Sequence, residues 1–167
     1  FGTALFFLYN LKSYLEIMIQ RIQTLYLLIV TVLLIVAMCI PVGSFTYADG
    51  TASEFTNLGV YLQSGCDSSP WGMFAILLLS AIISFATIFL FKNRMLQIRM
   101  TVFSSVLLIG YYLTFIVFMF ILKGRLDAGF HLSWGLCLPL ISIILNYLAI
   151  RAIGKDEVLV KAADRLR

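Results

Sequence analysis

Few side chains in this sequence are of types that carry out chemistry, and their spacing limits the reactions to consider. The sequence has one histidine, His131, and three cysteines, Cys39, Cys66 and Cys137. A haem bundle with two histidine ligands needs a second histidine, and a thiol oxidoreductase needs paired cysteines, yet no C-x-x-C pair occurs. The sequence also lacks a glycine-rich phosphate loop and a G-x-S-x-G nucleophile motif. We therefore expect no catalytic residue, no cofactor and no metal site, and we expect that the protein is not an enzyme.

The other chemical groups are hydroxyls and amides inside apolar stretches. Tyr111 and Tyr112 need hydrogen-bond partners there, because an unsatisfied buried polar group costs a few kcal/mol. We expect that another helix supplies the partner. A cleft exposing Asn146 and Tyr111 would suit a carrier or an enzyme for an apolar or lipid-like molecule, which is the alternative function. A fully packed Asn146 would argue against that alternative.

Composition places these groups in a membrane protein. The mean hydropathy is +1.02, 62% of the residues are hydrophobic and only 12% are charged. Four uncharged intervals each exceed the roughly 20 residues that a helix needs to cross about 30 Å of hydrocarbon. We predict an all-α membrane protein, a four-transmembrane-helix bundle with a short extracytoplasmic hairpin and a cytoplasmic C-terminal amphipathic helix. The predicted spans are about 24–42, 71–91, 101–122 and 131–150, within a single domain over residues 18–167.

Residues 1–17 precede Met18, from which the chain reads MIQRIQTLYLLIV, a basic flank followed by an apolar run. We expect residues 1–17 to be a non-native or upstream-translated extension and, if they belong to the protein, an interfacial helix. A signal peptide is the competing interpretation of the first apolar run. The run is long and no small-x-small cleavage pattern follows it, so we favour an uncleaved span.

The connections between spans differ in length and charge. Residues 44–70 form the only long loop, which contains acidic residues but no Lys or Arg. Alternating residues before Asp49-Gly50 predict a β-hairpin over 44–58 with a type I′ turn, which either caps the bundle or presents a ligand or partner surface. Residues 92–99 and 123–130 are expected to be short turns. His131 should then open the fourth span at the interface, as a headgroup-level side chain.

The fourth span contains a stripe of small and weakly polar residues at helical spacing. In lipid, helices associate through close packing of small residues and through interhelical hydrogen bonds. We therefore interpret the stripe as the helix-packing seam, formed by Gly135, Pro139, Ser142, Asn146 and Ala149. In the second span Ser80 and Ser84 form a similar small-xxx-small pair.

The tail over 151–167 should continue as a helix, with a bend at Gly154. Its apolar residues share one face and must be covered by the bundle, the membrane surface or another protein. We favour protein packing because the tail charges are mixed in sign. Together with the 93–99 turn, the tail forms the predicted interaction rim. Its members are Arg94, Gln97, Arg99, Asp156, Glu157, Leu159, Asp164, Arg165 and Leu166. We expect Arg94, Gln97 and Arg99 to face Asp156, Glu157 and Asp164 across this rim, either as a clasp within one chain or as a docking surface between chains.

The basic residues are distributed unevenly. Ten of the twelve Lys and Arg residues lie in the terminal segments and the 92–99 connection, and only Lys123 and Arg125 flank the opposite ends of the spans. Positive charge is retained in the cytoplasm. We therefore expect both termini to be cytoplasmic and the acidic loop to face outward.

Three segments give the chain a family resemblance. They are MIQRIQTLYLL from Met18, NRMLQIR at 93–99 and LAIRAIGKDEVLVKAADRLR at the end. With these segments the chain from Met18 to Arg167 resembles an uncharacterised family of small four-pass bacterial inner-membrane proteins, a domain of unknown function. The resemblance implies four helices with both termini in the cytoplasm, and it implies no activity, substrate or catalytic residue.

The functional expectation is a non-catalytic accessory or scaffold component that docks partners at its cytoplasmic rim. Its expected partners are the lipid bilayer and a membrane or cytoplasmic protein. Nucleic acid is not an expected partner, because no basic and aromatic groove is apparent.

Overall fold

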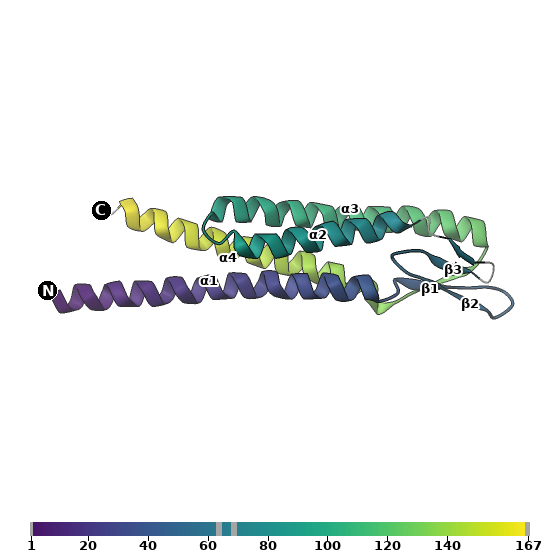
Figure 1. Cartoon of the computed structure of the whole chain (residues 1–167), viewed down its shortest axis with the longest axis horizontal. Helices are drawn as coiled ribbons and strands as arrows, with labels where there is room; N and C mark the ends of the chain where they lie inside the picture. The colour runs from purple at the N-terminus through teal and green to yellow at the C-terminus, as the bar shows by residue number, and fades with distance from the viewer. Residues whose placement is uncertain (1, 63–64, 68–69, 166–167) are drawn as a thin grey trace.

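The computed structural model describes residues 2–62, 65–67 and 70–165 and is elongated, with helices along its length and a small sheet at one end (Figure 1). The helices are α1 (Gly2–Cys39), α2 (Trp71–Phe89), α3 (Arg94–Leu126) and α4 (Cys137–Arg165), the last preceded by the 3-10 turn η1 (Trp134–Leu136). The strands are β1 (Gly43–Thr46), β2 (Ala52–Phe55), β3 (Val60–Leu62), β4 (Gly65–Asp67) and β5 (Gly129–Leu132). We call the end with the strands the sheet end. The opposite end, with the start of α1, the α2–α3 turn and the last turns of α4, is the terminal end.

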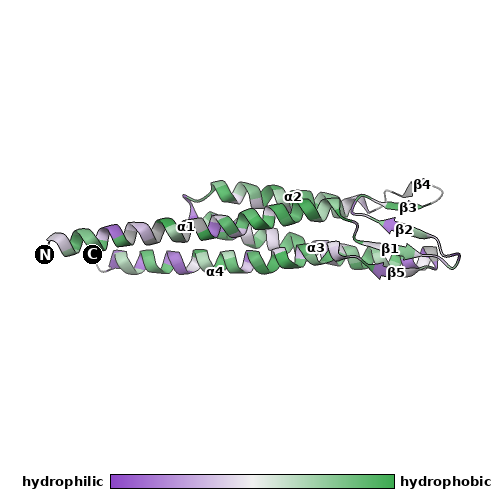
Figure 2. Ribbon diagram, turned by 90° about the horizontal axis from the view of Figure 1, so that it is seen from below, coloured by the Kyte–Doolittle hydropathy of each residue, from purple (hydrophilic) through white to green (hydrophobic). Residues whose placement is uncertain are grey.

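Each of the four helices contains a segment that is long and apolar enough to cross a membrane. These segments are Ile22–Cys39, Trp71–Phe89, Arg94–Arg125 and Trp134–Arg165. Hydrophobic residues cover the middle of the bundle, whereas hydrophilic residues are concentrated toward its ends (Figure 2). Large apolar side chains on the outside of the bundle are exposed, as expected for a surface that contacts lipid acyl chains. This arrangement confirms the predicted helical membrane fold.

The helices pack as a ring in which α1 contacts α2 and α4, and α3 contacts the same two helices. The core consists of apolar side chains from all four helices, including Leu34, Leu77, Leu108 and Ile153. Exposed Trp71 and Trp134 both lie where a helix begins at the sheet end. Tryptophan is enriched at membrane interfaces, which fits the exposed position of both residues at the starts of two apolar helices.

The sheet is larger than the predicted hairpin. β1 and β2 pair antiparallel with Phe45 opposite Ser53, which confirms a hairpin within 44–58. The type I′ turn is wrong, because the connection spans residues 47–51 and only Gly50 of the Asp49-Gly50 pair has a positive φ, of 78°. The strand order is β4-β3-β2-β1-β5, so the hairpin lies inside a five-stranded antiparallel sheet.

The strand β5 corrects the interpretation of residues 123–130 as a tight turn. α3 continues to Leu126, and residues 129–132 then pair with β1. His131 therefore does not open the fourth span. It lies on β5 opposite Ser44 with its side chain exposed. The fourth helix begins instead with η1 at Trp134, because the preceding backbone satisfies its hydrogen bonds in the sheet.

A close approach of β1 to β5 depends on glycine. A Cβ atom at Gly43 would lie 2.5 Å from the Phe130 ring and 2.7 Å from the carbonyl oxygen of His131. The same approach stacks aromatic rings between sheet and bundle, with the Phe45 and Phe130 centroids 5.0 Å apart and those of Phe55 and Phe115 6.1 Å apart. This aromatic cluster fixes the sheet onto the helices.

The helix boundaries also test the sequence predictions, and those of α1 and α3 differ from them. α1 is one helix from residue 2 to 39, so residues 2–17 continue the first span and do not form a separate interfacial helix. The α2–α3 turn covers only residues 90–93, and residues 94–99 form the first turns of α3. α4 runs without interruption through Gly154 to Arg165, so the tail continues the fourth helix as expected within the described residues.

Candidate functional site

The predicted seam lies on the buried face of α4. Pro139, Ser142, Asn146 and Ala149 are buried, as is Gly135 in η1. A Cβ atom at Gly135 would lie 2.8 Å from the carbonyl oxygen of Pro41. Because a backbone atom cannot move aside as a side chain can, a small residue is needed at this contact. The same face continues beyond the expected stripe, through Ile153 and Asp156.

Asn146 is the exceptional residue on this face. Its side chain has an exposed fraction of 0%, and neither its amide nitrogen nor its amide oxygen has a hydrogen-bond partner among the described residues. Ser84 on α2 is also buried with its hydroxyl unpaired in the described part of the chain. By contrast, Ser80 and Ser104 bond to each other across α2 and α3 at 2.9 Å. The polar groups inside the bundle therefore include satisfied and unsatisfied members.

Tyr111 is bonded to a loop residue, not to another helix as expected. Its hydroxyl donates to Oδ1 of Asn57 at 2.8 Å, and Nδ2 of Asn57 donates to the carbonyl oxygen of Ala37 at 2.8 Å. That carbonyl belongs to the last turn of α1, where intrahelical partners run out. The Tyr112 hydroxyl similarly donates to the carbonyl oxygen of Leu136 at 2.6 Å. Both tyrosines thus join α3 to the sheet end.

Sequence reasoning missed Asn57. It lies in a short loop between β2 and β3, where asparagine is common for local turn geometry alone. Its two partners are 20 and 54 residues away along the chain. No local pattern predicts such contacts, although a polar residue inside the predicted 44–58 hairpin was the available signal.

At the terminal end, one of the predicted rim contacts forms. Nη1 of Arg94 lies 3.0 Å from Oδ2 of Asp156, with side-chain exposures of 23% and 3%. The contact is electrostatic and lacks the direction of a hydrogen bond. It joins the first turn of α3 to α4. Gln97, one turn further along α3, is buried and its Nε2 donates to the carbonyl oxygen of Thr87 at 3.5 Å.

The other rim residues do not complete a clasp across the bundle. Glu157 pairs with Lys161 on its own helix at 2.8 Å. Arg99, Asp164 and Arg165 are exposed, and Leu166 lies outside the described residues. The predicted contact of three α3 residues with three acidic tail residues is therefore reduced to Arg94 and Asp156 within the described chain.

The apolar face of the tail is uncovered. Val158 and Leu159 have exposed fractions of 67% and 61%. Together with Gly154 and Lys155 they line a shallow groove on α4. We call these four residues the tail patch. The bundle does not cover it, which excludes the first of the three coverings considered for this face.

The geometry does not form the cleft required by the alternative function. Asn146 is packed and Tyr111 is buried with its hydroxyl bonded to Asn57, so the two do not line a common opening. Among the described residues, no three His, Cys, Asp or Glu side chains are grouped closely enough to hold a metal ion.

Four membrane-length helices arranged as a ring, with an extramembrane sheet at one end, define a multi-pass helical membrane protein. The chain belongs to the family described as Domain of unknown function (DUF4293), whose model matches residues 19–166. A comparison with curated proteins found no match.

Proposed function

We propose that this protein is a non-catalytic accessory or scaffold component of the bacterial inner membrane that docks a protein partner at its terminal end. The observation that carries the proposal is the exposed tail patch on a helix that the bundle holds in place. The support comes from its position, its charge and its rigidity.

The proposed orientation places the terminal end in the cytoplasm. Among the described residues, nine Lys and Arg residues belong to the terminal end, whereas Lys123 and Arg125 are the two at the sheet end. Because basic residues flanking spans are retained on the cytoplasmic side, this asymmetry supports cytoplasmic termini and a sheet that faces outward.

The position of the tail patch favours protein over lipid as its covering. α4 is 29 residues long, about 43 Å at 1.5 Å per residue, whereas hydrocarbon is about 30 Å thick. α4 continues along the bundle to the terminal end without turning sideways (Figure 1). With the span starting at η1, Val158 and Leu159 lie beyond the acyl chains. A membrane-surface helix would have to lie across the bundle axis instead.

The charges around the tail patch describe the partner. Arg94 neutralises Asp156, and Lys161 neutralises Glu157. Among the described tail residues, this leaves Arg151, Lys155 and Arg165 against Asp164. We therefore expect the partner to present an apolar depression with acidic residues at its edge.

The test is photo-crosslinking in native membranes, with a photoreactive amino acid in place of Val158 or, as the control, of Ala48 at the sheet end. A docking surface predicts a discrete crosslinked protein from Val158 alone, identified by mass spectrometry. The double variant Val158→Asp/Leu159→Asp should then reduce that partner's co-purification at least about tenfold, as expected for central interface residues.

A matched control places the same two charges elsewhere. Ala48 and Ala52 are exposed at the sheet end, so Ala48→Asp/Ala52→Asp should leave co-purification unchanged. Crosslinks to lipid alone, or equal loss of the partner in both double variants, would contradict docking at the tail patch.

A further inference from the structure

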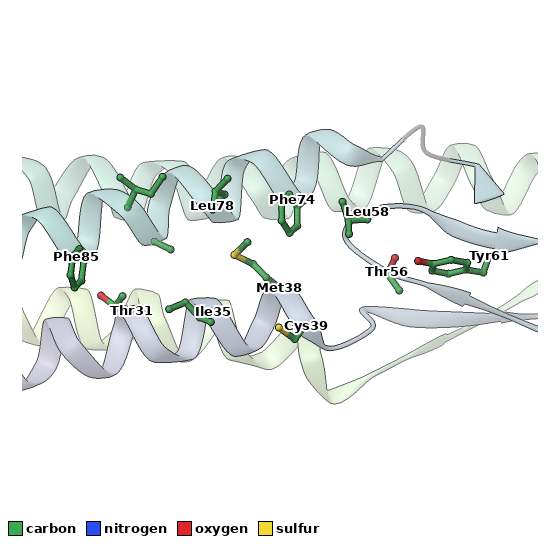
Figure 3. A pocket seen from close by; sticks show the side chains of 12 residues that line it. Thr31, Ile35, Met38, Cys39, Thr56, Leu58, Tyr61, Phe74, Leu78 and Phe85 are labelled. Atoms are coloured by element: carbon green, nitrogen blue, oxygen red, sulfur yellow. The ribbon is translucent and has the colours of Figure 1, made fainter.

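An apolar groove runs between α1 and α2 on the outside of the bundle, beneath the sheet (Figure 3). Its volume is about 740 Å³, within the range of small-molecule sites. α1 and α2 supply its two walls, the latter from Phe74 to Phe85, and Thr56, Leu58 and Tyr61 line it at the sheet end. No charged residue belongs to the lining.

The length of the groove along α2 is close to the thickness of one membrane leaflet. Phe74 and Phe85 mark its two ends on α2 and are eleven residues apart, about 17 Å at the rise of an α-helix. Half of the hydrocarbon thickness is about 15 Å. Counted from Trp71, where α2 begins, the groove runs from about 5 Å to about 21 Å along the helix, so most of it lies in the sheet-side leaflet and the remainder passes the middle of the bilayer.

The sheet closes the groove at the interface. Leu58 lies near the ends of α1 and α2. Tyr61 lies further out on β3, with its hydroxyl pointing toward Thr56 and the groove (Figure 3). A transmembrane helix lying in the groove would have to continue past this roof to leave the membrane. An acyl chain ends there, because its headgroup lies at the interface. The roof thus favours a lipid chain over a helix from a second copy or another protein.

The charges at the sheet end indicate the class of headgroup. The segment over 44–70 contains Asp49, Glu54 and Asp67 but no Lys or Arg. Lys123 and Arg125 are also at this end, but they belong to α3, which does not line the groove. An anionic headgroup would have no cationic partner in the 44–70 segment. An ammonium group would instead be attracted by the acidic residues of that segment.

We propose that this groove is a binding site for one acyl chain of a diacyl lipid from the sheet-side leaflet, with an uncharged or amine-bearing zwitterionic headgroup held beside Thr56 and Tyr61. α1 and α2 supply the apolar walls and the sheet supplies the polar end. The site is separate from the tail patch, and its test does not depend on the docking partner.

The experiment uses the full chain in phosphatidylcholine vesicles that contain one photoactivatable lipid at a time, with the photoreactive group in the acyl chain. The probes are phosphatidylethanolamine, phosphatidylglycerol and a free fatty acid. Peptide mass spectrometry then locates the crosslinks. We expect phosphatidylethanolamine to label groove-lining residues of α1 and α2 in preference to the other lipid-facing surfaces, and more strongly than the two anionic probes.

Adjacent residues on α2 provide a matched pair of variants. Leu78 lines the groove with an exposed fraction of 42%, whereas Leu79 faces lipid elsewhere with 47%. Leu78→Trp fills the groove and should reduce labelling there about tenfold, the loss from displacing roughly two methylene groups. Leu79→Trp should leave the labelling unchanged. Ile82→Trp, at a second exposed lining residue, should repeat the loss if Leu78→Trp fails to fold.

Four results would overturn the proposal. Labelling spread evenly over lipid-facing residues would mean that the groove holds only bulk lipid. Equal losses in Leu78→Trp and Leu79→Trp would remove the link to the groove. Labelling by phosphatidylglycerol or fatty acid equal to that by phosphatidylethanolamine would refute the headgroup assignment. Crosslinks between two copies of the chain across the groove would identify a protein occupant instead.

Discussion

At the scale of single residues, the small side chain of Asn57 makes two buried hydrogen bonds that connect distant parts of the chain. Its side-chain amide joins three segments, because it donates to the last turn of α1 and accepts from Tyr111 of α3 while belonging to the β2–β3 loop. Each bond is buried, so no solvent replaces it when one partner is removed. Loss of such a partner costs about 1–3 kcal/mol through desolvation of the group left behind.

We therefore predict that Asn57→Ala lowers the free energy of unfolding by about 2–4 kcal/mol, because two buried partners lose their bonds. Tyr111→Phe removes only one bond and should cost about 1–2 kcal/mol. Thermal unfolding in detergent micelles, followed by circular dichroism, measures both. In the double variant the losses should be less than additive, and strict additivity would show that the bond between the two side chains is not formed.

For Asn146 we predict a change of the opposite sign in the free energy of unfolding. Its amide is fully buried and has no partner in the described residues, so its burial is unfavourable by a few kcal/mol. Asn146→Leu replaces the amide with an apolar group of similar shape and should raise the free energy of unfolding by about 1–2 kcal/mol. The same unfolding measurement applies. A lower stability would show that the amide is bonded in the membrane, for example through a buried water molecule.

At the scale of the elements, Arg94 and Asp156 form an ion pair between α3 and α4 at the terminal end, in addition to the packing of the two helices. Asp156 is almost completely buried, and Arg94 supplies its compensating charge while retaining some contact with solvent. Breaking a fully buried pair costs about 3–5 kcal/mol, because a charge is left without compensation. Partial access of water to Arg94 should reduce that cost.

We predict that Arg94→Gln lowers the free energy of unfolding by roughly 2–4 kcal/mol. The double change Arg94→Gln/Asp156→Asn removes both charges and should recover at least half of the loss. Chemical denaturation in mixed micelles provides the measurement, with Arg99→Gln, an exposed arginine on the same helix, as the control. Equal losses in the Arg94 and Arg99 variants would mean that the pair with Asp156 is not specific.

The tail patch depends on this element-scale contact. Asp156 lies two and three residues before Val158 and Leu159 on the same uninterrupted helix. The ion pair therefore holds α4 against α3 directly beside the tail patch. The tail can present its apolar side chains at a fixed angle, which is what a docking surface requires.

At the scale of the whole molecule, the two ends differ in architecture and in charge. The sheet end consists of five short strands on an aromatic cluster, whereas the terminal end consists of helix ends that carry most of the basic residues. A bilayer protein with this asymmetry should insert in one direction only.

We predict that a cysteine at position 49 is labelled by a membrane-impermeant maleimide in intact cells, in a background where the native cysteines are replaced by serine. The change Asp49→Cys places the thiol in the exposed β1–β2 connection. Lys155→Cys, exposed at the terminal end, should be labelled only after the cells are permeabilised. Labelling of Lys155→Cys in intact cells would reverse the proposed orientation.

Local composition and helical periodicity are enough to predict part of this fold. Four long uncharged stretches predict four spans, because the thickness of hydrocarbon sets the length of a helix that crosses it. The small-residue face of α4 followed from helical periodicity, and the buried residues Ser142, Asn146 and Ala149 lie on that face.

The features that join distant segments are visible only in the tertiary structure. β5 pairs with β1 although more than 80 residues separate them, and Asn57 finds partners on two different helices. The groove likewise depends on tertiary structure, because residues of α1, of α2 and of the sheet end line it together. Residues 129–132 form a strand because β1 is available to pair with them, and no periodicity in four residues can reveal a partner so far along the chain.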